Sequence, residues 1–225
     1  MDDFDEREQW ERVKQWLREQ GPWVVGGVAA ALLALAGWRW WQAHQESRDL
    51  AASASYEQAI DAFSRSDFTG GLAIVDGIVR DYPGSAYASQ AQLAAARIAV
   101  ETNKLPEAVQ RLQQVVASTK DPELALIARL RLARVQVSEQ QPDAALATLS
   151  GASPGAFAAL YAEARGDALL AKGDKAGALA AYRAAREAGG SDSALDAASG
   201  TGSGTGTGTA NTDLLTLKIN ELSSS

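Results

Sequence analysis

The side chains that perform most enzyme chemistry are scarce in this sequence of 225 residues. It has no cysteine and a single histidine, His44, which excludes thiol catalysis, thiolate metal sites and disulfides. A catalytic Ser-His pair or a histidine metal site would need partners that the sequence does not offer. No Gly-rich phosphate loop follows a strand-like run. We therefore expect a protein that is not an enzyme and that uses no cofactor.

Charged side chains offer the chemistry of binding instead. Beyond Trp41 the chain has 16 basic and 21 acidic residues, which argues against a nucleic-acid surface because such a surface needs a basic patch. We single out Arg97 and Arg134, since a guanidinium can bind a partner's carboxylate or backbone carbonyls. The alternative is that both arginines pair with acids of their own domain, such as Glu101 or Glu139.

An apolar run, PWVVGGVAAALLALAGWRWW, occupies residues 22–41. No charge occurs from residue 21 to 38, and a helix of this length extends roughly 27 Å, close to the hydrocarbon thickness of a bilayer. The acidic N-terminus and the missing cleavage site argue against a cleaved signal peptide, and the lack of a polar face argues against a buried core helix. We therefore expect a retained transmembrane helix with these residues at its two interfaces: Trp23, Trp38, Arg39, Trp40 and Trp41.

The basic residues around this run predict its orientation. Four of them precede the uncharged residues 21–38, and only Arg39 and Arg48 follow these residues closely, so the N-terminus should be cytoplasmic and the rest of the chain exported. Residues 1–20 also form one apolar helical face, with Trp10, Val13, Trp16 and Leu17. This face is typical of a helix lying on the inner leaflet, or it could be a docking site for a cytosolic protein.

The rest of the chain is rich in Ala, Leu, Gln and Arg, which favours helices, and it repeats. A small residue starts each of four similar stretches, GLAIV, AVQRL, ALATL and ALAAY, at offsets of 37, 37 and 33, and another small residue lies twelve positions before each. This pattern matches the tetratricopeptide repeat, a helix–turn–helix unit with small residues where its two helices cross; a plain Ala-rich helical bundle is the alternative. We expect an all-α protein, with one transmembrane helix followed by a solenoid of about four helix pairs.

Solenoids of this kind bind peptides or proteins on a concave face formed mainly by the first helix of each pair. Counting from the small residues, we expect a partner-binding groove that contains Tyr56, Ile60, Phe63, Leu93, Arg97, Val100, Leu130, Arg134 and Val137. The same count places Glu163, Asp167 and Leu170 there in the last repeat. The alternative is that half of these residues belong to ordinary packing between helices.

The C-terminal part contains a Gly/Thr-rich stretch followed by TDLLTLKINELS. Leu215, Ile219 and Leu222 form an apolar stripe typical of a helix, which we expect to cover the last repeat; a partner-binding peptide is the alternative. We divide the chain into a cytoplasmic amphipathic tail (1–20), a transmembrane helix (21–41), a tetratricopeptide-like periplasmic domain (42–190), a low-complexity linker (191–212) and a capping helix (213–225).

These parts, taken in order, resemble a known family. GWRWWQAHQ, LRLARVQV, RGDALLAKGDKAGA and LKINELS are similar to stretches of the ancillary subunits of the SecYEG translocon, the YfgM-like proteins, although the Gly/Thr linker is not expected in that family. The resemblance implies a single-pass protein of the bacterial inner membrane, close to the SecYEG translocon. Its implied partners are a membrane-anchored periplasmic chaperone of prolyl-isomerase type, exported client proteins and the lipid bilayer.

The resemblance also implies a second role. The leading hypothesis is a non-enzymatic subunit that recruits chaperone and newly translocated proteins through its repeats. The alternative is a membrane-anchored regulator that sequesters a cytosolic stress-response protein through its N-terminal tail. Deletion of residues 1–20 would distinguish the two, because only the regulator would lose its stress-response effect while its translocon association remained.

Overall fold

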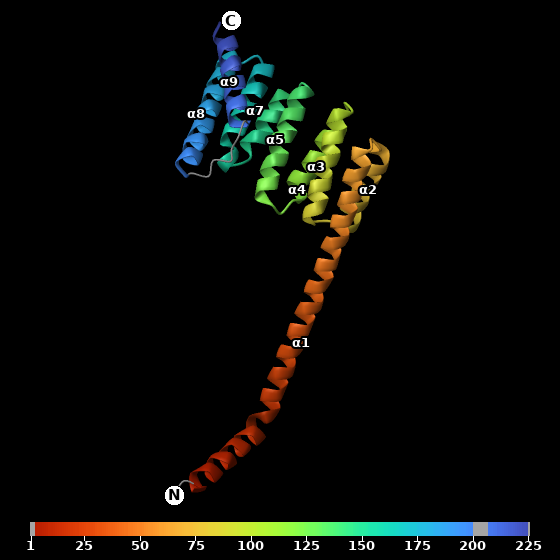
Figure 1. Cartoon of the computed structure of the whole chain (residues 1–225), viewed down its shortest axis with the longest axis vertical. Helices are drawn as coiled ribbons and strands as arrows, with labels where there is room; N and C mark the ends of the chain where they lie inside the picture. Colours follow the sequence, from red (N-terminus) through yellow and green to blue (C-terminus); the bar gives the residue numbers. More distant parts are fainter. Residues whose placement is uncertain (1–2, 200–206, 225) are drawn as a thin grey trace. The chain divides into compact units, whose positions relative to one another are not determined.

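The computed structural model describes the backbone of residues 3–199 and 207–224, and the side chains of residues 27, 30–42, 44–189 and 213–223. All regular elements in these ranges are helical (Figure 1). In chain order they are α1 (Asp3–Ser64), α2 (Phe68–Asp81), α3 (Ala86–Glu101), α4 (Leu105–Ser118), α5 (Pro122–Ser138), α6 (Pro142–Ser150), the 3₁₀ helix η1 (Gly155–Phe157), α7 (Ala158–Ala171), α8 (Lys175–Ser199) and α9 (Thr207–Ser224).

The chain divides into two units, residues 1–51 and 52–225. The first unit consists of the N-terminal part of α1. Among the described residues, no helix is long and apolar enough to cross a membrane. The predicted tail and the first part of the predicted span lie where the structure describes no side chains, as does Trp23.

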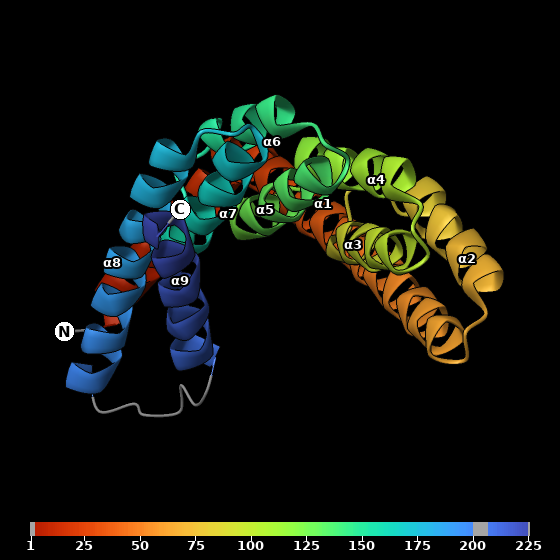
Figure 2. The same cartoon turned by 90° about the horizontal axis from the view of Figure 1, so that it is seen from above.

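The second unit contains the predicted helix pairs. The end of α1 pairs with α2, and α3–α4, α5–α6 and α7–α8 follow as pairs. Within this unit, α2, α4 and α6 follow the outer side of an arc, and α3, α5 and α7 follow its inner side (Figure 2). The prediction of an all-helical, tetratricopeptide-like solenoid is confirmed.

The helices begin where the sequence supplies caps. The carboxylates of Asp67, Asp121 and Asp174 each accept hydrogen bonds from backbone N–H groups at a helix start, and the hydroxyl of Ser85 does the same for α3. Proline lies in the first turn of α4, α5 and α6, where its missing N–H costs nothing. These local signals favour helix starts at these residues.

The small residues of the repeat lie where the helices cross, as predicted. Six alanines at these positions, Ala59, Ala96, Ala133, Ala108, Ala145 and Ala178, are at most 2% exposed. The two glycines, Gly71 and Gly166, are also buried. A Cβ added to Gly166 would lie 2.5 Å from Cδ1 of Tyr182, and one added to Gly71 would lie 2.5 Å from Cδ1 of Phe63. Each glycine therefore allows an aromatic ring of the same helix pair to pack against its backbone.

The C-terminal boundaries differ from the prediction. We expected a linker over 191–212, but α8 continues to Ser199 and α9 begins at Thr207. The Ala-rich residues after 190 can extend an existing helix, because adding residues to a formed helix costs much less than starting one. The same reasoning applies to the Gly/Thr residues before Leu215, although their propensity for helix is poor. Residues 200–206 lie outside the described part of the chain.

Candidate partner-binding face

The predicted groove residues lie on the first helix of each pair, and some of them are open to solvent. Val100 on α3 is 42% exposed, and Ile60 at the end of α1 and Leu170 on α7 are each 39% exposed. Val100 and Leu170 occupy equivalent positions in their repeats. These three residues are the apolar part of the predicted face that a partner could contact.

Leu93 and Leu130, which we also expected in the groove, are buried between helices. Leu93 is 7% exposed and packs with Ala128, Leu132 and Val135 of α5. Leu130 is 5% exposed and packs in the same way with residues of α7. Three positions before the crossing residue, the side chain therefore points toward the next pair rather than into the open face, because stacking has to bury an apolar residue between successive first helices.

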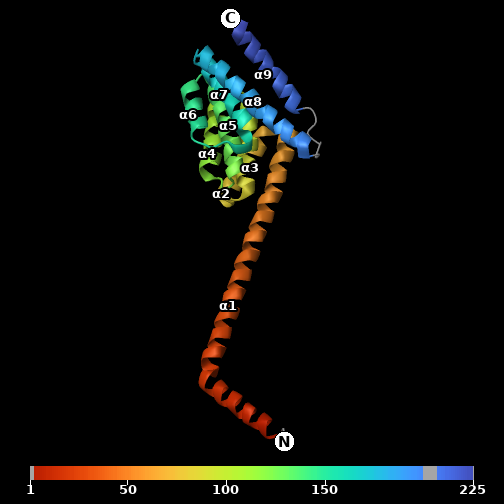
Figure 3. The same ribbon diagram turned by 90° about the vertical axis from the view of Figure 1, so that its left-hand side faces the viewer.

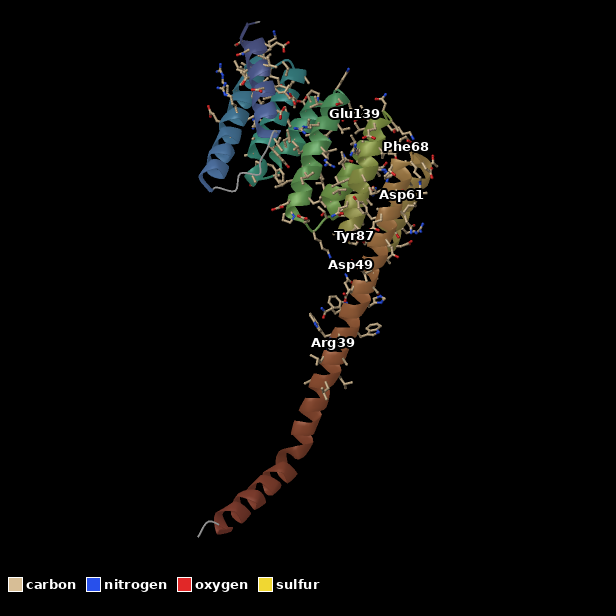
Figure 4. The ribbon with its side chains drawn as sticks, in the orientation of Figure 1. Arg39, Asp49, Asp61, Phe68, Tyr87 and Glu139 are labelled. Carbon is tan, nitrogen blue, oxygen red and sulfur yellow. The ribbon has the colours of Figure 1, made fainter. Side chains whose placement is uncertain are left out.

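Tyr56, Phe63 and Val137 are only partly exposed. Each packs against the buried core of its own part of the solenoid. The ring of Tyr56 lies 6.0 Å from the ring of Tyr87, near the start of α3 (Figure 4). These three residues contribute to packing between helices, and only part of each side chain is accessible to a partner.

The two arginines pair with acids of their own domain. Nε of Arg97 lies 2.7 Å from Oε1 of Glu101, one turn further along α3, and the Arg97 side chain is 76% exposed. Nη2 of Arg134 on α5 lies 3.7 Å from Oε2 of Glu163 on α7. The predicted internal partner Glu101 is confirmed for Arg97, whereas the partner of Arg134 is Glu163 rather than Glu139. The exposed Arg97–Glu101 pair contributes little to stability, whereas the side chain of Glu163 is only 10% exposed.

A cluster of polar side chains joins α7, α8 and α9. Nζ of Lys218 on α9 lies 2.8 Å from Oδ1 of Asp167 and 3.1 Å from Oε1 of Glu163, both on α7. The hydroxyl of Tyr182 on α8 donates a hydrogen bond of 2.7 Å to the same Oδ1 of Asp167. The ammonium of Lys218 also lies 5.1 Å from the centre of the Tyr182 ring, a cation–π arrangement. We call these four residues, Glu163, Asp167, Tyr182 and Lys218, the acidic cluster.

The pKa values of Tyr182 and Lys218 in the acidic cluster are both raised, so both groups keep the protons that their hydrogen bonds need. Burial raises the pKa of Tyr182, and the carboxylates of Asp167 and Glu163 raise it further. Burial lowers the pKa of Lys218, but its hydrogen bonds and charge interactions with Asp167 and Glu163 outweigh burial, so that its pKa is raised above the ordinary value. The phenol therefore stays neutral and the ammonium stays charged throughout the physiological range.

α9 brings Lys218 to this cluster through apolar contacts. Leu215 and Ile219 are 3% and 6% exposed and pack with Ala178, Tyr182 and Ala185 of α8. α9 lies alongside α8 in two views (Figures 2 and 3). The sequence analysis named Leu215, Ile219 and Leu222 as one stripe but missed Lys218. The available signal was a lysine inside that stripe, directly before Ile219.

A hollow of about 930 Å³ lies elsewhere, across α6, α7 and α8. Alanines form much of its wall, and Arg165, Tyr161 and Asp174 also line it. None of the predicted groove residues borders it. It opens beside α6, which is shorter than α2 and α4.

Among the described residues, no group of three His, Cys, Asp or Glu side chains could hold a metal ion.

The predicted membrane-interface residues with described side chains lie together on α1. Trp38, Trp40 and Trp41 are more than half exposed, and Arg39 projects from the same stretch (Figure 4). The rings of Trp38 and Trp41 are 5.6 Å apart, and Trp40 stacks on His44 at 5.8 Å. His44 therefore lies next to an aromatic ring.

Comparison with known proteins supports the repeat assignment. A family model described as a tetratricopeptide repeat-like domain matches residues 14–200. A solved structure titled MamA RS-1 ArsTM double mutant is similar with a TM-score of 0.51, covering 77% of this chain and 94% of that chain at 14% identity. At this identity the likeness concerns the fold alone.

Curated relatives give the closer relationship. A protein of Escherichia coli (strain K12) named ancillary SecYEG translocon subunit is 38% identical over 180 residues, which are 80% of this chain and 86% of that protein. Proteins of the same name are 32% identical in Aggregatibacter actinomycetemcomitans and 27% identical in Neisseria gonorrhoeae, over 83% and 82% of this chain and 91% and 88% of their own length. With its helical repeats, this chain therefore belongs to the tetratricopeptide repeat-like family of ancillary SecYEG translocon subunits.

Proposed function

We propose that this chain is a non-enzymatic accessory protein of the SecYEG translocon in the bacterial inner membrane. The observation that carries the proposal is its similarity, over most of both chains, to proteins named ancillary SecYEG translocon subunit. In this proposal residues 21–41 span the membrane, the N-terminus is cytoplasmic and the repeats lie in the periplasm. The exposed tryptophans and Arg39 on α1 are consistent with an interfacial position for that end of the span.

The repeats would recruit other proteins to the translocon. A membrane-anchored periplasmic chaperone of prolyl-isomerase type and emerging exported proteins are the partners that fit this role. The exposed apolar side chains Ile60, Val100 and Leu170, on first helices, supply a surface that could contact an unfolded segment. Arg97, with its mostly exposed guanidinium beside Glu101, adds a polar edge to that surface.

Site-specific photo-crosslinking in cells would test the proposal. A photoreactive amino acid at Val100 should capture translocon, chaperone or exported proteins, identified by mass spectrometry. Gln113 is the matched control, because it is exposed on α4, the second helix of the same pair, and should capture much less. Equal capture at both positions would contradict a binding role for the first helices, and capture of no envelope protein at either position would contradict the accessory role.

A further inference from the structure

The last repeat differs from the others at one packing position. Tyr56, Leu93, Leu130 and Glu163 occupy equivalent places on the four first helices, since they follow the repeat offsets of 37, 37 and 33. Leu93 and Leu130 are buried there, and Glu163 is equally buried at 8% exposed. A carboxylate thus replaces a leucine at a position that the solenoid uses for apolar packing.

This substitution is costly unless a cation accompanies it. A buried carboxylate has to be paired and hydrogen-bonded, and even a good buried ion pair is often no more stabilising than apolar residues of similar size. A terminal helix that only had to cover the last repeat would need no charge at this place. Buried polar groups are instead well known for selecting partner and register in helix packing.

α9 supplies both the cation for Glu163 and the apolar residues that cover the end of the last repeat. It places Leu215 and Ile219 on Ala178, Tyr182 and Ala185 of α8, and Lys218 between Glu163 and Asp167 of α7. The recognised pattern is therefore an apolar residue, a lysine three positions later and a second apolar residue directly after it. Leu214 and Leu217, which lie on another face of α9, are 55% and 64% exposed.

We propose that this surface, which we call the α9 seat and which consists of Glu163, Asp167, Ala178, Tyr182 and Ala185, is a docking site for amphipathic helices that carry a lysine in this pattern. α9 is its resident occupant, and a partner helix with the same chemistry binds by replacing α9. The charge of the seat favours a lysine in the occupant, because Nζ of Lys218 lies 2.8 Å from Asp167 and 3.1 Å from Glu163, whereas the guanidinium of Arg134 is further from Glu163, at 3.7 Å. The inference rests on the proposed function in that it describes how the repeats recruit a protein.

A peptide-binding experiment with the purified full chain tests the exchange. The probe is a fluorescent peptide of residues 207–224. The receptor is the full chain with Leu215→Asp and Ile219→Asp, which removes the apolar anchors of its own α9. By fluorescence anisotropy this variant should bind the peptide at least about tenfold more tightly than the wild-type chain, whose own α9 competes for the seat. Circular dichroism confirms that the helices of the variant remain folded.

Two matched peptides test the chemistry of recognition. In the first, Lys218→Glu in the probe should weaken binding at least about tenfold, because it places a third carboxylate against Glu163 and Asp167. In the second, a designed Ala/Gln helix that keeps only Leu, Lys and Ile at the three anchoring positions should displace the probe, whereas its Lys→Glu twin should not. A receptor with Lys218→Glu serves as a second means of freeing the seat should the double substitution unfold the chain.

Each result bears on the inference. Equal binding to wild-type and variant chains, equal binding of the Lys218→Glu probe, or no binding to a folded variant would each overturn it. Unfolding of both receptor variants would also overturn it, since α9 would then be a permanent part of the core. The assay contains neither membrane nor translocon, so its failure leaves the crosslinking result at Val100 standing, and a failure of that crosslinking leaves this assay standing.

Discussion

At the scale of single residues, small side chains carry the most reliable information in this sequence. All the predicted crossing residues are buried, because two helix axes can approach closely only where a side chain is short. The direction of larger side chains was less predictable. Leu93 and Leu130 share the helix face expected for a groove, yet the next helix pair covers them. Counting positions along one helix does not reveal which of its residues a neighbouring helix will cover.

Gly166 provides a test at this scale. Gly166→Ala should destabilise the fold by about 1–3 kcal/mol, because the new Cβ would collide with the ring of Tyr182, which is fully buried and hydrogen-bonded to Asp167. We expect the melting temperature of the full chain, followed by circular dichroism, to fall by several degrees.

Gly77→Ala is the matched control for Gly166→Ala. Gly77 lies inside α2, and an added Cβ there would have only Arg80 within reach, at 4.0 Å. Since alanine favours a helix interior over glycine by about 0.5–1 kcal/mol, the control should melt at the same or a higher temperature. Equal melting of the Gly166→Ala and wild-type chains would mean that Tyr182 does not pack on this glycine.

At the scale of elements, one turn geometry recurs with the repeat. Ser66, Asn103, Gln140 and Gly173, which follow the first helices of the four pairs, have φ values of 63°, 57°, 59° and 88°. The N–H of the residue after each one donates to the carbonyl five positions back, as in Asp67 to Ala62 and Gln141 to Gln136. This is the Schellman end of a helix. Its recurrence explains why four different turn sequences, only one of them with glycine at this place, form the same hairpin.

Gln140 is the least suitable of these residues for a positive φ. Gln140→Gly should therefore raise the free energy of unfolding by about 1 kcal/mol, because glycine adopts this conformation without the Cβ clash that other residues suffer. The urea midpoint of the full chain measures the change. Gln110→Gly is the matched control, since Gln110 is exposed inside α4 and the same substitution should cost up to about 1 kcal/mol there. A loss of stability in both variants would contradict the predicted benefit at Gln140.

Element boundaries at the C-terminal end were harder to predict than the turns. Prolines mark the starts of α4, α5 and α6 in the sequence. Glycine and threonine instead recur throughout residues 200–212, so they do not single out the residues at which α8 ends and α9 begins. Whether a helix extends through Ala- and Gly/Thr-rich residues depends on whether the adjacent helical turn is already formed, because adding residues to an existing helix costs less than starting a new one. Lys218 was likewise missed because its carboxylate partners lie on α7, 51 and 55 positions away in the sequence.

At the scale of the whole molecule, the distribution of residue types along the chain predicts which end lies in a membrane and which end lies in water. All six tryptophans occur at or before residue 41, and the long uncharged run lies among them. The repeats also contain an uncharged stretch, residues 144–162, but Ser150, Gly151, Pro154 and Gly155 interrupt it, so it does not form one long apolar helix. Composition therefore predicts a membrane end and a water-exposed end, whereas the resemblance to the ancillary SecYEG translocon subunits rests on particular stretches such as LRLARVQV and is confirmed by relatives of that name.

The orientation of the chain gives the last prediction. Alkaline phosphatase is active only where its disulfides can form, outside the cytosol, so a fusion to Glu19 should be inactive and a fusion to Ser225 active. The reason for the orientation is the bias of four basic residues before the uncharged residues 21–38 against two, Arg39 and Arg48, shortly after them. The matched control is the Ser225 fusion without residues 22–41, which should lose activity if this segment carries the C-terminal part across the membrane. Activity at Glu19 and none at Ser225 would reverse the proposed topology and transfer the repeats, with the α9 seat, to the cytosol.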